Sequence, residues 1–284
     1  MQVFTGSRNL RAFLSAQRTG KRLGFVPTMG ALHRGHLSLV KGSIAENDLT
    51  VVSIFVNPTQ FDNEEDLLKY PVSLQRDLAL LEAGGSPVVF VPDVAGIYGE
   101  KPVRRIFDFN GLDKTMEGAF RPGHFDGVWT VVRRLFGIIE PDTAYFGEKD
   151  FQQLQIIRHM TARESLPVRI AGLPIVREED GLAMSSRNRR LTPRQRQAAP
   201  AIYRALQQVK RMFGTKSVRE ITEWYIDEIS SYPELKPEYF FIAEESTLQP
   251  VESIIPGGKY RAFTAVYAGK IRLIDNIPLY NTQQ

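Results

Sequence analysis

The chain has 284 residues and a net charge of +4, with 43% hydrophobic and 24% charged residues, a composition that argues against disorder. This length exceeds one typical core of roughly 100–200 residues, so we expect two domains. Because the chain has no cysteine, disulfides, thiolate metal sites, iron–sulfur clusters and a cysteine nucleophile are excluded.

The first part of the chain alternates strand-like and helix-like patterns. The strand-like apolar runs are 23–26, 50–56, 87–91 and 144–146. Apolar residues recur at helical spacing in 35–46, 74–81, 126–139 and 150–164. Strands that alternate with helices predict a parallel sheet covered on both faces, so we expect a Rossmann-like α/β domain at residues 1–176.

The pattern changes after about residue 176. Thr192-Pro193 predicts the start of a helix that runs to about Phe213, with Pro200 as the site of a kink. The segment 217–220 resembles a capping box that opens a second helix. Strand-like runs follow at 239–243, 260–267 and 271–274, with a hairpin turn at 269–270. We therefore expect a small α+β domain with antiparallel strands at residues 177–284.

The sequence contains neither a signal-peptide pattern nor a membrane span. Residues 1–21 lack an apolar core, and no stretch approaches the about 20 apolar residues that cross a bilayer. We expect a cytoplasmic protein with no membrane partner. Arginines gather between residues 187 and 196, and with so mild a net charge this cluster favours an anionic ligand over a nucleic-acid groove.

The segment PTMGALHRGH, residues 27–36, follows a predicted strand and enters a predicted helix. Open parallel sheets bind ligands at this kind of junction. Gly30 and Gly35 allow a tight turn and a close approach to phosphate, and free N–H groups at a helix start favour anions. His33 and His36 can both face one phosphate. The alternatives are a glycine-containing turn with incidental histidines, or a zinc site that would need a third ligand.

A second motif, Gly147-Glu148-Lys149-Asp150, also lies between a short strand and a helix. Lys149 supplies a point charge for phosphates, and Asp150 can accept a hydrogen bond from a ribose hydroxyl. The alternative is that Asp150 caps the helix, with Gln153 closing a capping box.

The segment 181–188 ends in Met184-Ser185-Ser186-Arg187-Asn188. Hydroxyls and a guanidinium on a mobile loop can follow the phosphates and stabilise a departing diphosphate. The alternative is a serine-rich turn before a basic helix.

Two further segments carry polar side chains whose roles the residues alone leave open. Asn57 and Gln60 follow a buried strand, and their carboxamides suit a hydroxy acid, although a plain turn explains them equally. The segment 116–125 is a loop with exposed Arg121 and His124.

Together these motifs resemble known proteins. The pattern His33-Arg34-Gly35-His36 is similar to the His-x-Gly-His signature of the adenylyl-transferring superfamily, and residues 184–187 are similar to its Lys-Met-Ser-Lys-Ser loop. The segments PTMGALHRGH, SIFVNPTQF, RPGHFDGV, FGEKDFQQL and MSSRN resemble, in order and spacing, the pantoate–β-alanine ligase family. The resemblance covers nearly the whole chain.

The resemblance implies roles for individual residues. It implies a catalytic set of His33, His36, Lys149, Ser185, Ser186 and Arg187, with His36 as the acid. It implies ATP binding by Met29, Gly30, Ala31, Leu32, His33, Arg34, Gly35, His36, Gly147, Glu148, Lys149, Asp150, Val176, Met184, Ser185, Ser186 and Arg187. It implies binding of pantoate and β-alanine by Gln60, Gln153, Asn57, Tyr70, Arg121 and His124, with Glu117 in the pocket wall.

The resemblance also implies the reaction. ATP adenylates (R)-pantoate with release of diphosphate, and β-alanine then displaces AMP to give (R)-pantothenate. We expect Mg²⁺ bound mostly through ATP phosphates, because Asp77 is the one carboxylate in the stretch after Tyr70, where some relatives are more acidic. A homodimer is expected, with the small C-terminal domain as a lid over the reaction.

Two other functions remain open at this point. A nucleotidylyltransferase of the same superfamily would release a nucleotide conjugate instead of free AMP. An RNA-binding module would use the arginines from 187 to 196, and its affinity would fall steeply with salt.

Overall fold

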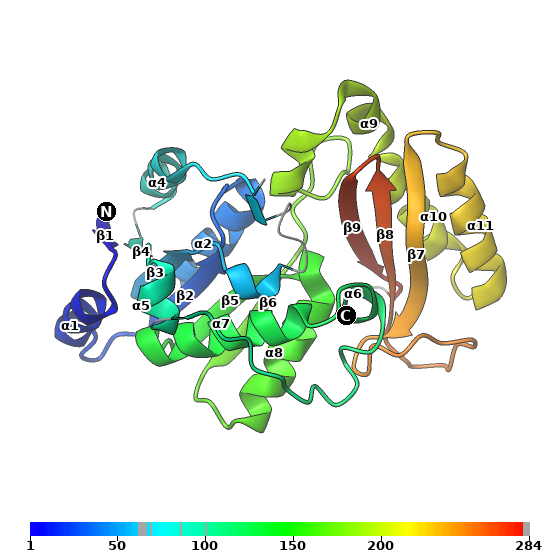
Figure 1. Cartoon of the computed structure of the whole chain (residues 1–284). Helices are drawn as coiled ribbons and strands as arrows, with labels where there is room; N and C mark the ends of the chain where they lie inside the picture. The colour runs from blue at the N-terminus through cyan, green and yellow to red at the C-terminus, as the bar shows by residue number, and fades with distance from the viewer. Residues whose placement is uncertain (62–66, 69, 86, 100, 281–284) are drawn as a thin grey trace. The chain divides into compact units, whose positions relative to one another are not determined.

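The computed structural model describes residues 1–61, 67–68, 70–85, 87–99 and 101–280 (Figure 1). The chain forms two compact units. The first consists of Met1–Asn110, Arg121–Glu148 and Gln153–Pro174, and the second of Gly111–Phe120, Lys149–Gln152 and Ile175–Gln284. This division differs from a single cut after residue 176, because two short earlier segments pack with the C-terminal part.

The first unit is built on a parallel sheet, which confirms the expected Rossmann-like fold. Its six described strands lie in the order β1-β4-β3-β2-β5-β6, and every described neighbouring pair is parallel. The strands are β1 Gln2–Phe4, β2 Leu23–Thr28, β3 Leu49–Ile54, β4 Val88–Phe90, β5 Thr143–Gly147 and β6 Arg169–Leu173. The central strands are almost continuously buried, as expected where helices cover both faces.

Helices cover both faces of this sheet. They are α1 Ser7–Gln17, α2 Arg34–Glu46, α4 Leu74–Ala83, α5 Val94–Tyr98, α7 His124–Ile139 and α8 Phe151–Arg163. On one face, Val26 and Val52 pack in a cluster with residues of α2 and α4. On the other face, Phe136 of α7 meets Phe25 edge to face, with ring centroids 6.3 Å apart.

The second unit is the expected small α+β domain. Its described strands, β7 Leu235–Glu244, β8 Tyr260–Ala268 and β9 Ile271–Pro278, form an antiparallel sheet in chain order. The helices are α6 Met116–Phe120, α9 Pro193–Ala198, α10 Ala201–Met212 and α11 Val218–Ser230. Helices α10 and α11 cover one sheet face (Figure 1), where Leu206, Ile221 and Val266 share an apolar core.

Helix boundaries in this unit follow the capping signals. The predicted capping box is present at Ser217–Glu220, and the predicted helix start at Thr192 also forms a capping box, with Gln195. The helix expected from 193 to 213 is two helices, α9 and α10, because Pro200 cannot continue the backbone hydrogen-bonding pattern. Gly269 takes a φ of 60° in the turn between β8 and β9. Across the described residues, no helix has the length and apolar character needed to span a bilayer.

Candidate active site

The sheet of the first unit brings three motif-carrying loops to one edge. Strand β2 lies between β3 and β5, so the chain turns to one side after β2 and to the other side before β5. Such a switch point is where open α/β sheets bind ligands, at the carboxyl ends of the strands. Residues 29–33 follow β2, residues 55–61 follow β3, and Glu148 follows β5.

The loop after β2 is fixed by a buried carboxylate. Gly30 and Ala31 both have left-handed backbones, with φ values of 81° and 50°. Asp77, in the first turn of α4, accepts the Ala31 N–H at Oδ2 and the Leu32 N–H at Oδ1, both at 2.8 Å. A left-handed alanine costs roughly 1–2 kcal/mol, and hydrogen bonds to a charged acceptor offset that cost.

This finding changes the role expected for Asp77. Its side chain is 1% exposed, and both oxygens accept backbone N–H groups. The geometry supports a residue that positions the loop rather than a ligand of Mg²⁺. Within the described ranges, no three His, Asp or Glu side chains gather into a metal-binding group.

His33 and His36 form a reciprocal cap at the start of α2. The Gly35 N–H donates to Nδ1 of His33 at 3.1 Å, and the His33 N–H donates to Nδ1 of His36 at 3.3 Å. The ring centroids are 4.0 Å apart. A neutral imidazole that accepts at Nδ1 carries its hydrogen at Nε2, so both rings hold an Nε2–H donor.

Many backbone N–H groups of this loop have acceptors inside the chain. The N–H groups with acceptors inside the chain are those of Gly30, Ala31, Leu32, His33, Gly35, His36 and Leu37. The expectation of free N–H groups at the start of the helix is therefore wrong for these residues. The two imidazoles each add an Nε2–H to the donors of this segment.

The loop after β3 places a carboxamide beside the loop after β2. Gln60 ends the short 3-10 helix η1, Pro58–Gln60, and its Nε2 lies 2.9 Å from Sδ of Met29. Its Oε1 accepts a hydrogen bond from Nδ2 of Asn57 at 3.1 Å. Gln60 is half-buried, so its amide is accessible as well as oriented.

Asn57 orients the side chain of Gln60 and is itself held by further hydrogen bonds. It is 1% exposed, its Nδ2 also donates to Gly127 O at 3.1 Å, and its Oδ1 accepts from Tyr98 Oη at 2.6 Å. The same oxygen accepts from Thr59 Oγ1 at 3.0 Å. These bonds give Asn57 a positioning role toward Gln60, and its direct contact with substrate stays a prediction.

The start of α7 completes this corner of the first unit. Nδ1 of His124 lies 2.8 Å from the Gln60 carbonyl oxygen, and its Nε2 lies 3.4 Å from an Arg121 guanidinium nitrogen. An added Cβ at Gly127 would lie 2.2 Å from Thr59 O, so only glycine lets α7 approach η1 this closely. Arg121 and His124 therefore lie beside Gln60, with which they share the expected role of binding pantoate and β-alanine.

Two other expected substrate residues are placed less specifically. Tyr70 is 8% exposed, and its ring meets Phe61 edge to face at 5.7 Å. Gln153 is half-buried in the first turn of α8. Its neighbour Gln152 is 3% exposed and donates to Leu112 O and Thr115 O, so it holds backbone within the second unit.

The second unit carries the other half of the expected residues. Ser185 caps the short 3-10 helix η3, Ser186–Arg190, with its Oγ accepting the Arg187 N–H at 3.2 Å. The Met184 N–H donates to Val176 O at 3.0 Å, which joins the expected adenine and phosphate segments. Nζ of Lys149 lies 3.9 Å from the Asp150 carboxylate.

Glu117 serves as an anchor in the second unit. Its carboxylate binds the Arg272 guanidinium through two hydrogen bonds of 2.7 Å and accepts from Tyr239 Oη at 2.8 Å. Burial, together with the negative charge of Glu117, raises the pKa of Tyr239 well above its usual value. Glu117 therefore holds α6 against the sheet, and its expected place in the pocket wall stays a prediction.

Several supporting residues escaped the sequence reasoning. They include Asp77 as a loop anchor, Tyr98, and the Asp275-Asn276 pair of β9. The signal that could have found the last two is the position of the polar pair Asp275-Asn276, which directly follows the apolar strand-like run 271–274.

The comparisons with known proteins agree on one family. The family model of pantoate–β-alanine ligases matches residues 2–278. The pantothenate synthetase of Christiangramia forsetii is 52% identical over 99% of this chain and 100% of the relative. That of Bacteroides fragilis is 49% identical over 98% of both chains.

Solved structures agree with the sequence comparisons. The crystal structure of pantothenate synthetase from Thermus thermophilus has a TM-score of 0.92 at 43% identity, covering 99% of this chain and 100% of that one. The pantoate–β-alanine ligase of Francisella tularensis, complexed with β-γ ATP and β-alanine, has a TM-score of 0.83 at 34% identity and covers both chains fully, 100% of each.

Proposed function

The chain belongs to the pantoate–β-alanine ligase family, and from this premise we propose how its residues divide the work of the reaction. The enzyme is an ATP-dependent ligase that condenses pantoate with β-alanine to give pantothenate. The observation that carries the residue-level proposal is the His33–His36 pair, which presents two Nε2–H donors at the carboxyl end of β2.

In the first step, a carboxylate oxygen of pantoate attacks the α-phosphorus of ATP. A new phosphorus–oxygen bond forms, the bond to the β-phosphate breaks, and diphosphate leaves with its electron pair. Charge on the phosphate oxygens shifts during this displacement, and donors placed beforehand stabilise it. His36 acts as the acid toward these oxygens, with His33 as its partner.

The remaining phosphates need cationic and hydroxyl groups. Lys149 supplies a point charge, while Ser185, Ser186 and Arg187 hold the β- and γ-phosphates and the departing diphosphate. Gly147, Glu148 and Asp150 bind the nucleoside, and Val176 lies against adenine. Met184 joins this set because its N–H is bonded to Val176 O.

Pantoate is held beside the histidines. Gln60 both donates to and accepts from pantoate, with Asn57 fixing its orientation and Gln153, Arg121, His124 and Tyr70 completing the pocket. In the second step, the amine of β-alanine attacks the acyl carbon of pantoyl adenylate, and AMP leaves. A mixed anhydride hydrolyses readily, so the second unit is proposed to act as a lid that excludes water.

Magnesium, location and assembly are further proposals from the family likeness. Since Asp77 is engaged by backbone N–H groups, Mg²⁺ is held by ATP phosphates and water, and it neutralises phosphate charge. The enzyme is proposed to be a cytoplasmic homodimer.

A substrate-omission assay with an isotope label tests the reaction. The protein is incubated with Mg²⁺-ATP, β-alanine and pantoate labelled with ¹⁸O in its carboxylate, and each component is omitted in turn. We expect AMP and pantothenate in equal amounts, with one labelled oxygen transferred to AMP. A nucleotide conjugate without free AMP would favour a nucleotidylyltransferase, and unlabelled AMP would exclude pantoyl adenylate.

A further inference from the structure

Strand β9 carries a buried polar pair, Asp275-Asn276, in the middle of an otherwise apolar strand. The two residues are 4% and 2% exposed. Neighbours in a strand face opposite sides of a sheet. Ile271, Leu273 and Ile277 alternate with Asp275 and pack in the core with α10 and α11, so Asp275 belongs to that face and Asn276 to the other.

Asp275 holds the segment that leads into the serine–arginine loop. Its Oδ2 and Oδ1 accept hydrogen bonds from NH1 and NH2 of Arg177, at 2.6 and 2.9 Å. Arg177 pairs with Ala183 across a short antiparallel bridge, and its NH1 also donates to Gly181 O at 3.1 Å. Residues 177–183 thus form a hairpin that ends directly before Met184 and Ser185.

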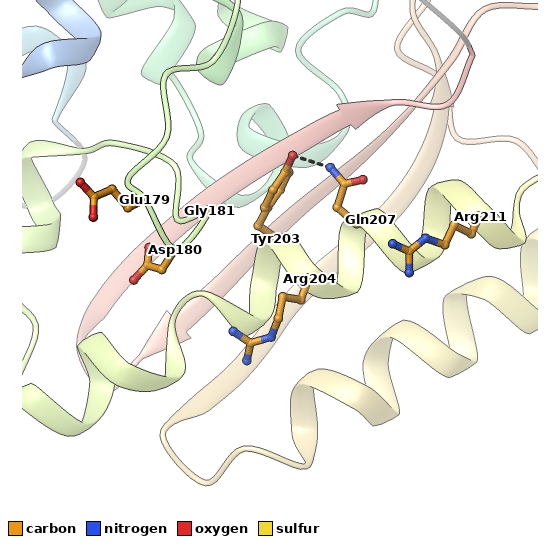
Figure 2. A pocket seen from close by; sticks show the side chains of 7 residues that line it. All are labelled: Glu179, Asp180, Gly181, Tyr203, Arg204, Gln207 and Arg211. Carbon is orange, nitrogen blue, oxygen red and sulfur yellow. Dashed lines mark hydrogen bonds between the residues drawn. The ribbon is translucent and has the colours of Figure 1, made fainter.

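Helix α10 supports the same arginine from the side. The guanidinium carbon of Arg177 lies 3.7 Å from the ring centroid of Tyr203. Figure 2 shows Tyr203 beside Gly181, with its hydroxyl bonded to the Gln207 amide. An added Cβ at Gly181 would come within 2.4 Å of the Tyr203 ring. The hairpin is therefore packed against both β9 and α10.

Asn276 holds the lysine motif on the opposite face. Its Nδ2 donates to the backbone oxygen of Lys149 at 2.9 Å, and its Oδ1 accepts from NH1 of Arg261 at 2.6 Å. Arg261 is itself fixed by an ion pair of 2.7 Å with Glu245. The amide of Asn276 is thus oriented by one partner and binds the lysine segment with its other end.

We propose that Asp275 and Asn276 are positioning residues for adenylation, because they set the spacing between Lys149 and the Ser185–Arg187 loop. This inference rests on the proposed function, in which both segments contact the ATP phosphates. Neither residue touches ATP in this mechanism. Their effect falls more on the first step, in which the diphosphate held by Lys149 and the Ser185–Arg187 loop is still attached, than on the second step, in which it has left.

The two half-reactions give the test. The first is followed by pantoate-dependent diphosphate release from ATP, and the second by pantothenate formation from synthetic pantoyl adenylate and β-alanine. In Asp275→Asn and Asn276→Ser we expect diphosphate release to fall on the order of ten- to hundredfold, as a small misplacement would cause. Pantothenate formation from the adenylate should stay within about twofold of the wild type.

A matched control separates positioning from general damage. Glu238 is a largely buried carboxylate on the same sheet, and it pairs with Arg272 at 2.6 Å rather than with Lys149 or Arg177. Glu238→Gln should leave both half-reactions unchanged. If Asp275→Asn does not fold, Arg177→Lys and Asn276→Ser carry the same comparison, with folding checked by circular dichroism.

Every outcome decides the inference. Equal loss in both half-reactions, or unchanged diphosphate release in a folded variant, would overturn it. Failure of the wild-type protein to release diphosphate with pantoate would instead refute the proposed function.

Discussion

The imidazole rings of His33 and His36 lie with their centroids 4.0 Å apart, and the backbone N–H of the first donates to Nδ1 of the second. Nδ1 of His36 thereby serves the fold, while Nε2 is the nitrogen to which we assign the proposed chemistry. Substitutions that separate these two nitrogens can test each function by itself.

His36→Ala should reduce adenylation about a hundredfold or more, by analogy with the loss of an oxyanion donor. His36→Asn retains an acceptor near Nδ1 and loses the Nε2 donor, so it should be as impaired as alanine. His36→Gln retains a donor near Nε2 and should recover part of the rate. Diphosphate release in single-turnover experiments measures all three variants.

Circular dichroism spectra that match the wild type would show that the fold is retained in this series. Normal diphosphate release by His36→Asn would contradict the role assigned to Nε2. If His36→Asn and His36→Gln were equally impaired, a donor at the Nε2 position would contribute nothing to the rate.

Asp77→Asn should weaken the loop that carries both histidines. The carboxylate accepts two buried N–H groups, and an amide can accept only with its oxygen, so one donor loses its partner at a cost of about 1–3 kcal/mol. We expect a lower melting temperature and a roughly tenfold lower kcat/KM for ATP. Glu82→Gln, at an exposed carboxylate of the same helix, should change neither.

Magnesium distinguishes the two roles considered for Asp77. If the residue positions the loop, raising Mg²⁺ will not restore activity to Asp77→Asn. Recovery of the wild-type rate at high Mg²⁺ would instead identify Asp77 as a metal ligand.

The sequence predicted elements that have a strong local signal. Strands β2 and β3 were predicted from continuous apolar runs, which the structure buries, and the helix starts at Thr192 and Ser217 were predicted from adjacent residues. Strand β6 was missed because it begins with an exposed arginine and only half buries the rest. The α9–α10 break depends on one proline within an otherwise helical pattern.

Sequence reasoning proposed the motif residues of the candidate site but not the residues that support them. Its motif residues lie within short segments, so local spacing and a family resemblance were enough to propose them. Their supports act across long separations, such as Asp77 with Ala31 and Asp275 with Arg177. Nothing in local sequence specifies which distant backbone a buried carboxylate will meet, and the fold has to supply that information.

Gln60→Ala should weaken pantoate binding more than ATP binding. The Gln60 amide is oriented by Asn57 and Met29, and its loss removes one or two hydrogen bonds to the hydroxy acid. At about 0.5–1.5 kcal/mol each, these bonds correspond to a roughly tenfold higher Kd for pantoate. Titration calorimetry with each ligand measures the difference, and equal weakening of both ligands would count against the assignment.

Arg187→Ala should suppress the rapid release of diphosphate on mixing enzyme, ATP and pantoate. Loss of the guanidinium removes charge-assisted hydrogen bonds to the phosphates, so we expect a rate about tenfold to a hundredfold lower. Arg187→Lys keeps the charge without the bidentate geometry and should be intermediate. Arg194→Ala, at an exposed member of the same arginine cluster, is the control and should behave as the wild type.

Glu220 gives a prediction about pH in the second unit. Hydrogen bonds from the backbone N–H and hydroxyl of Ser217, with a smaller effect of Lys216, lower its pKa to about 2. Since the folded-state pKa lies below the unfolded value near 4.5, the capping box stabilises α11 fully above that pH. That stabilisation is lost as the pH falls toward about 2.

Carboxyl carbon NMR should therefore show Glu220 still ionised at pH values where ordinary glutamates are protonated. Ser217→Ala should raise this pKa, because the hydroxyl donor is removed while the backbone donor remains. A midpoint near 4.5 in the wild-type protein would show that the capping box does not form in solution.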